Sequence, residues 1–134
     1  MVRPKKHLGQ HFLKNETIAQ QIANSLQPGD YDKVVEIGPG MGVLTQFLLK
    51  SNKDVHVVEL DSESVEYLKG HFAMRYDHIV EGDFLKMDLK ETFGSNIAVI
   101  GNFPYNISSQ IVFKVLENRH MIPQMAGMFQ KEVA

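Results

Sequence analysis

The sequence predicts an α/β fold with a doubly wound, mostly parallel sheet. Short apolar runs alternate with segments whose apolar residues recur every three or four positions, which is the pattern of strands alternating with amphipathic helices. The strand runs are apolar at consecutive positions, as is typical of strands covered on both faces. These observations favour a Rossmann-like sheet with helices on both sides.

Each expected strand is short and is bounded by glycine, proline or polar residues. The strands are expected at residues 34–37, 55–60, 78–80, 97–100 and 125–129. Helices are expected at residues 15–27, 43–50 and 62–72 and from about residue 108. In the first helix Ile18, Ile22 and Leu26 recur at four-residue spacing, and Pro28 ends the pattern. Ser62 has the side chain of an N-cap residue for the third helix.

The chain of 134 residues is long enough for one domain. Residues 1–14 show no helical or strand period and begin with three cations in MVRPKK, so we interpret them as a basic arm before a domain at residues 15–134. The final letters, MFQKEVA, resemble a strand that enters a turn. We therefore expect an incomplete, truncated sheet that belongs to a longer protein.

Composition excludes several classes of protein. Formal net charge is −2 and there is no cysteine, which excludes disulfide scaffolds and thiolate metal sites. The N-terminus has charges but no apolar core of a signal peptide, and no apolar run approaches the length of a membrane span. We expect a cytoplasmic protein with no membrane association.

Functional side chains follow each of the first four predicted strands. In an open parallel sheet ligands bind beyond the carboxyl ends of the strands, at the point where the strand order reverses. After the first strand the letters GPGMG place glycines at Gly38, Gly40 and Gly42, which allow a ligand to approach the backbone at a helix N-terminus. The dinucleotide motif G-x-G-x-x-G requires a third glycine where this chain has Val43.

Two carboxylates come after the second and third strands. Glu59 ends the second strand 21 positions after Gly38 and can accept hydrogen bonds from both ribose hydroxyls of a nucleoside. Asp83 follows the third strand and can accept from the exocyclic amine of adenine, while Phe84 can pack on the adenine ring. We interpret Asp61 as a solvated acid at the strand end. These positions together predict a pocket for adenosine with a polar tail.

The letters NFPY after the fourth strand suit a planar amine. The Asn102 oxygen and the backbone carbonyl of Phe103 or Pro104 can accept the two N–H groups of a nucleobase amine and direct its nitrogen lone pair toward a methyl group. Pro104 biases Phe103 toward extended backbone, and Tyr105 offers a face on which an extruded base can stack. Positioning would supply most of the catalysis.

These stretches resemble the ribosomal RNA adenine N6,N6-dimethyltransferases, a family that includes the macrolide-resistance methyltransferases. The resemblance covers the whole chain, through KKHLGQHFLKN, VEIGPGMGVLT, VVELD, EGDFL, GNFPYNISS and QKEVA. It implies a fold of the S-adenosylmethionine-dependent methyltransferase type, S-adenosylmethionine as cofactor, and two successive methyl transfers to adenine N6 in small-subunit rRNA. It also implies a role in maturation of the small ribosomal subunit.

The resemblance assigns roles to individual residues. His11 and Leu13 close over the cofactor, and Gly38 and its neighbour Gly40 approach the methionine part. Glu59 holds the ribose. The remaining implied contacts are Asp83 with the adenine amine, Asn102 between cofactor and target, and Tyr105 with the target base.

Three departures from the family pattern accompany the resemblance. His11 stands where the family often has Asn, and Phe103 stands where Leu is commoner, which would narrow the pocket. Family members also continue through further strands to a helical domain that grips rRNA, and we expect these parts to be absent from the fragment. The fragment would then bind RNA weakly.

Other functions stay open at this point. One is a large-subunit rRNA methyltransferase of the macrolide-resistance type, and another is a NAD-dependent dehydrogenase, which Val43 and the NFPY letters disfavour. A third is a ribosome-assembly factor whose binding matters more than its catalysis.

We expect no metal site, since the four-residue spacing of His7 and His11 spans Gly9 in a loop. An exposed sheet edge would allow self-association.

Overall fold

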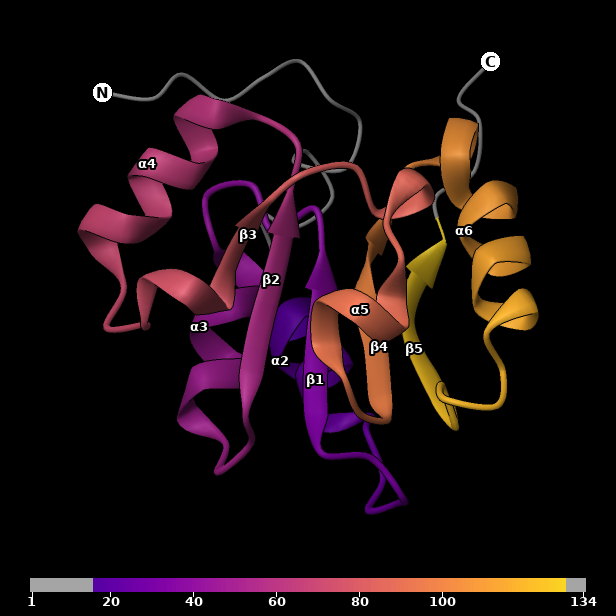
Figure 1. Ribbon diagram of the computed structural model, residues 1–134. Coiled ribbons are helices and arrows are strands. Elements are labelled where there is room, and N and C mark those ends of the chain that lie inside the picture. Colours follow the sequence, from indigo (N-terminus) through magenta and orange to yellow (C-terminus); the bar gives the residue numbers. More distant parts are fainter. Residues whose placement is uncertain (1–15, 130–134) are drawn as a thin grey trace.

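The structure is a computed structural model and describes residues 16–129 (Figure 1). In chain order the elements are α2 (Glu16–Asn24), β1 (Lys33–Ile37), α3 (Val43–Lys50), β2 (Val55–Glu59), α4 (Ser62–His71), the 3-10 turn η1 (Tyr76–His78), β3 (Ile79–Glu81), the 3-10 turn η2 (Phe84–Lys86), α5 (Leu89–Phe93), β4 (Ile97–Phe103), α6 (Tyr105–Glu117) and β5 (Gln124–Phe129). The predicted alternation of strands and helices is confirmed. Among the described residues no helix is long and apolar enough to cross a bilayer.

The five described strands form one parallel sheet in the order β3-β2-β1-β4-β5. The chain runs outward from β1 through β2 to β3, then returns to the other side of β1 for β4 and β5. The order therefore reverses between β1 and β4. Helices cover both faces of the sheet (Figure 1), as the doubly wound prediction requires.

Side chains that alternate along the central strands supply two separate cores. Val34 packs in a cluster with residues of α2 and α3, whereas the next residue, Val35, packs in a cluster with residues of α5 and α6. Residues of α4 pack against Val57 and Ile79 on the same face as α2 and α3. Every residue of β2 and β4 is buried, which explains why their sequences are apolar at consecutive positions.

Strand β4 is longer than predicted. It runs through Phe103 rather than ending at Ile100, and α6 begins at Tyr105 rather than near residue 108. Gly101 and Asn102 weaken a strand prediction by propensity, but Gly101 pairs with both β1 and β5, and Asn102 pairs with Met128 of β5. The change from strand to helix occurs at Pro104, whose φ of −62° suits a helix start.

Two local predictions need correction at helix N-termini. Asp61, not Ser62, is the N-cap of α4: its carboxylate accepts from the Ser64 backbone N–H at 3.0 Å and from the Ser64 hydroxyl at 2.9 Å. Asp61 is therefore not simply a solvated acid. The helix α5 was not predicted, because its five residues are too few to show a period; Asp88 caps its start.

Candidate functional site

The register of the sheet brings the ends of four strands together. Ile37 of β1 pairs with Val58 of β2 and with Gly101 of β4, so Gly38 lies between Glu59 and Asn102. Glu59 in turn pairs with Glu81 of β3, and Asp83 follows two residues later. All four ends lie at the edge toward which the arrowheads point in Figure 1. The predicted convergence of these loops is thus a property of the fold.

The glycine turn after β1 has a backbone that other residues rarely adopt. Gly38, Gly40 and Gly42 have φ of +66°, +57° and +85°, in the left-handed region that favours glycine. A Cβ built on Gly38 would meet no described atom within 4 Å, so the space beside this residue is open. The turn leads directly into α3, whose first backbone N–H groups form a partial positive charge.

Glu59 is positioned by two backbone hydrogen bonds. The Gly40 N–H donates to its Oε1 at 2.9 Å and the Asp61 N–H donates to its Oε2 at 2.9 Å. The side chain is largely buried, with Glu59 8% exposed. A carboxylate offers about four acceptor positions, so each oxygen can accept one more bond from a ligand. The same residue therefore orders the glycine turn and faces the space in front of it.

A second acid, Glu36, lies beneath the site and was not singled out from the sequence. It is 1% exposed, and the Thr45 hydroxyl donates to its Oε1. Burial raises the pKa of Glu36 to about 8, against the opposing hydrogen bond from Thr45 and with a further increase from the charge of Glu59. Glu36 is therefore protonated at neutral pH. The available signal was an acid inside the otherwise apolar run VVEI.

Asp83 and Phe84 differ in how much of each side chain is available to a ligand. Asp83 is partly exposed, and its Oδ1 accepts from the Leu85 N–H at 3.0 Å at the start of η2. Phe84 is 3% exposed and lies in the core cluster of α5 and α6. The Asp83 carboxylate keeps acceptor positions for a ligand, whereas the Phe84 ring presents almost no surface to one.

An exposed apolar side chain, Leu60, follows Glu59 directly. It is 69% exposed, which is unusual for leucine beside a buried strand end. Its position directly after Glu59 makes it a candidate wall for a planar ring. The sequence analysis missed Leu60 because a single leucine at a strand end has no signal beyond its hydropathy.

The residues after β4 divide between core and surface. Asn102, the second-last residue of β4, is 7% exposed and lies next to the glycine turn, whereas Phe103 is fully buried. The Phe103 ring packs on Phe129 with centroids 5.1 Å apart. Tyr105 is 37% exposed at the start of α6. The Pro104 carbonyl accepts from the Ile107 N–H at 3.2 Å and has a second lone pair.

Glycines on two strands make room for Phe103. A Cβ on Gly101 would come within 2.9 Å of the Phe103 ring, and one on Gly127 would come within 2.8 Å. The bulk that Phe103 adds relative to Leu is therefore taken up between β4 and β5, not in the open space beside Gly38. The predicted roles of His11 and Leu13, and the basic arm, lie outside the described residues.

Comparison with known proteins identifies the family. A model of the family "Ribosomal RNA adenine dimethylase" matches residues 1–134. The chain belongs to this family. The ribosomal RNA small subunit methyltransferase A of Cytophaga hutchinsonii is 57% identical over 135 residues, covering 99% of this chain and 52% of that protein. The protein of the same name from Parabacteroides distasonis is 58% identical over 134 residues, covering 100% of this chain and 50% of that protein.

Two solved structures support the same family at greater distance. A dimethyladenosine transferase from Plasmodium falciparum is 32% identical with a TM-score of 0.68, over 88% of this chain and 42% of that one. The 23S rRNA methyltransferase ErmE is 27% identical with a TM-score of 0.64, over 85% of this chain and 46% of that one. The chain spans about half the length of the curated relatives it matches.

The adenine dimethylase fold is shared with more distant methyltransferases. The glycopeptide N-methyltransferase MtfA, solved with S-adenosylmethionine, has a TM-score of 0.57 at 20% identity, which shows a common fold. The predicted fold of the S-adenosylmethionine-dependent methyltransferase type is confirmed. The dehydrogenase alternative is not supported, because the family and the relatives named here are methyltransferases.

Proposed function

We propose that this adenine dimethylase chain binds S-adenosylmethionine and takes part in two successive methyl transfers to N6 of adenines in small-subunit rRNA. The observation that carries the proposal is the adjacency of Asn102 and Gly38 across the β1–β4 pair. This adjacency sets a buried amide beside an open, glycine-lined space. The reaction would serve small-subunit maturation, with rRNA as partner and the cytoplasm as location.

The residues at the strand ends fit the cofactor. The open space beside Gly38 admits a flexible tail at the backbone, and the spare acceptor positions of Glu59 suit ribose hydroxyls. Asp83 can accept from the adenine amine while Leu60, 69% exposed, packs on the ring. When bound, S-adenosylmethionine supplies an electrophilic methyl group. These carboxylates, backbone groups and apolar side chains can bind and orient the cofactor without a metal ion or a cysteine.

The chain's own part in transfer is to orient the target amine. The Asn102 side-chain oxygen accepts one N–H, and a carbonyl of Phe103 or Pro104 accepts the other, so the nitrogen lone pair turns toward the methyl group. Tyr105, at the start of α6, stacks on the base. As the methyl group bonds to nitrogen its bond to sulfur would break and S-adenosylhomocysteine would leave. The methylated nitrogen would be acidic and would lose its proton to water, so no dedicated general base is required.

Sequence identity favours the small-subunit target over the large-subunit alternative. Curated small-subunit methyltransferases are 53–58% identical to this chain, whereas the 23S rRNA methyltransferase ErmE is 27% identical.

The assembly-factor alternative concerns a separate property, namely docking on the subunit without methyl transfer. Asn102→Ala separates the two, because a protein that still docks on the subunit but transfers no methyl group has an independent binding role.

The ribose contact is tested with S-adenosylhomocysteine and its 2′-deoxy analogue in calorimetric titrations. We expect the normal chain to prefer the ribose form by about 10- to 150-fold, since a hydrogen bond to a charged group contributes roughly 1.5–3 kcal/mol. Glu59→Ala should weaken both ligands and remove the preference. The comparison of ligands matters because Glu59 also holds the Gly40 N–H. A preference that survives in Glu59→Ala would disprove the contact.

The transfer itself is tested on undermethylated small and large ribosomal subunits with a labelled methyl donor. The full-length Cytophaga hutchinsonii relative, with and without the change equivalent to Asn102→Ala, provides the matched control. We expect dimethyladenosine in the small subunit only. Binding without transfer by this chain, alongside transfer by the longer relative, would place part of the active machinery outside these 134 residues. Labelling of the large subunit by either protein would refute the target.

A further inference from the structure

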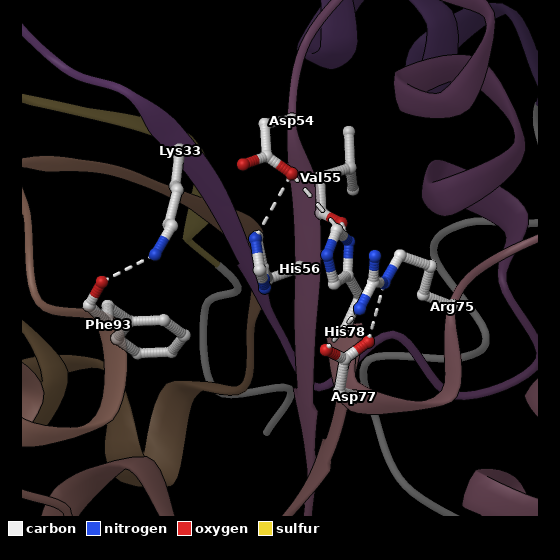
Figure 2. A network of polar contacts seen from close by, with 8 residues as sticks. All are labelled: Lys33, Asp54, Val55, His56, Arg75, Asp77, His78 and Phe93. Carbon is white, nitrogen blue, oxygen red and sulfur yellow. Dashed lines mark hydrogen bonds and ion pairs between the residues drawn. The ribbon is translucent and has the colours of Figure 1, made fainter.

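Three potential metal ligands gather at the edge of the sheet opposite the candidate site. Asp54 precedes β2, His56 is its second residue, and His78 ends η1 just before β3. Because β2 and β3 are parallel neighbours, their starts lie side by side. Figure 2 shows the three side chains converging beside β2. The proposed methyl transfer uses none of them.

The two distances from Asp54 to the histidine nitrogens suit a small tetrahedral ion. Asp54 Oδ1 lies 3.1 Å from His56 Nε2 and 3.6 Å from His78 Nδ1, and all three ligand atoms lie within 4.8 Å of one another. Zinc binds nitrogen and carboxylate oxygen at about 2.0–2.2 Å, so adjacent tetrahedral ligands stand roughly 3.3 Å apart. The two distances from Asp54 bracket that value.

His56 supplies an independent sign that a ligand belongs here. Its residue is 7% exposed, and its buried Nε2 has no hydrogen-bond partner among the described residues. Asp54 Oδ1 lies 3.1 Å from this nitrogen. In a neutral imidazole, a ring nitrogen that donates no hydrogen bond offers its lone pair to a cation.

His78 can rotate to bind the ion, and the exposure of His78 and Asp54 lets the ion enter from solvent. The two histidine rings stack with centroids 3.9 Å apart, and His78 Nδ1 lies 3.2 Å from the Val55 carbonyl oxygen. Since a carbonyl only accepts, this contact places the proton on Nδ1. Metal binding would move that proton to Nε2 and pivot the ring. The side chains of His78 and Asp54 are 24% and 44% exposed, which leaves both room and access from solvent.

We propose that Asp54, His56 and His78 bind one divalent transition-metal ion, of which Zn²⁺ fits best, with water as the fourth ligand. Two imidazoles and one carboxylate favour Zn²⁺ over Mg²⁺ or Ca²⁺, which prefer oxygen ligands. The ion joins the starts of β2 and β3 and serves stability, since ligands and chemistry of this fold belong to the opposite edge. The proposal departs from the expectation of no metal site, which rested on the spacing of His7 and His11.

The probe is cobalt(II), whose visible absorption reports tetrahedral coordination. Zn²⁺ is then added to compete with the bound cobalt. The background is the double variant His7→Gln/His11→Gln, so that the other closely spaced histidines cannot contribute. We expect one ion per chain and a rise in melting temperature with Zn²⁺. His78→Gln and Asp54→Asn, at partly exposed positions, should each lower the affinity by about 100-fold.

The matched control is His120→Gln, which removes an exposed histidine far along the chain and should leave binding and the melting shift unchanged. Circular dichroism of each metal-free variant checks that the fold is retained. Absence of binding in the background variant would overturn the proposal. Binding that His78→Gln and Asp54→Asn leave unaltered would overturn it equally, because the ion would then occupy another site.

Discussion

Glu36 couples the stability of the candidate site to pH. In the unfolded chain its pKa is near the ordinary value of 4.5, and in the folded chain burial raises the pKa to about 8. The folded state therefore holds a proton that the unfolded state has lost between these values. The stability contributed by this proton is complete below about pH 4.5 and declines as pH rises through about 8.

The first prediction concerns Glu36→Gln, which keeps the acceptor for the Thr45 hydroxyl but cannot ionise. The normal chain should lose on the order of a few kcal/mol of unfolding free energy between about pH 5 and pH 9 that the variant does not lose. Urea denaturation across this range measures the difference, and other titrating groups cancel in it. Parallel pH profiles for the two proteins would mean that Glu36 is ionised in the folded state.

At single positions, residue type predicts poorly which side chains line a site. Phe84 and Phe103 follow strand ends in motifs typical of a ligand pocket, yet both are buried in the core. Leu60 is apolar and is exposed there instead. An isolated aromatic residue carries no information about its direction, because that depends on the register of the strand before it.

At the scale of elements, the glycine turn is constrained by α4 as well as by its own backbone. A Cβ on Gly42 would lie 2.5 Å from the Phe72 ring, which follows α4, and Gly42 has φ of +85°. The motif thus serves two purposes. It admits a ligand beside Gly38, and it allows α3 and the end of α4 to pack closely.

The second prediction follows from that packing. Gly42→Ala should destabilise the chain by roughly 2–4 kcal/mol, the sum of left-handed backbone strain and overpacking. The matched control is Gly70→Ala inside α4, where a Cβ meets nothing within 4 Å. That change should stabilise by about 0.5–1 kcal/mol. Thermal unfolding of both variants measures the contrast, and equal effects of the two would contradict it.

At the scale of the whole molecule, the sheet has a protected centre and two weaker edges. β1 and β4 have paired strands on both sides, whereas β3 and β5 end the described sheet. The burial of β4 is complete, while β5 has exposed residues that include Phe129, 49% exposed. Local opening should begin at the edges, where fewest contacts must break.

The third prediction is the order of amide hydrogen exchange. In dilute solution the amides of β1 and β4 should exchange slowest, and those of β3 and β5 should exchange markedly faster. Exchange in β5 that slows as protein concentration rises would indicate the self-association expected for an exposed edge. Slow exchange in β3 and β5 that does not depend on concentration would contradict this account of the sheet.

Much of the fold and part of the site follow from the sequence by itself. Hydrophobic periodicity determined the class of fold and the place of all five described strands, and the motifs indicated the family that comparison then established. The helix at Val43–Lys50 agrees with its predicted bounds. These features are local, because a strand or an amphipathic helix expresses its period within a few residues.

Only the tertiary structure decided what the neighbours of each residue are. It extended β4 through Asn102 because β5 pairs with it as far as Phe103, and it set Glu36 in a buried place where its carboxyl group stays protonated at neutral pH. It also brought Asp54 and His78, distant in sequence, to within 3.6 Å. Pairing, burial and electrostatic environment arise from segments far apart along the chain, so no window of sequence contains them.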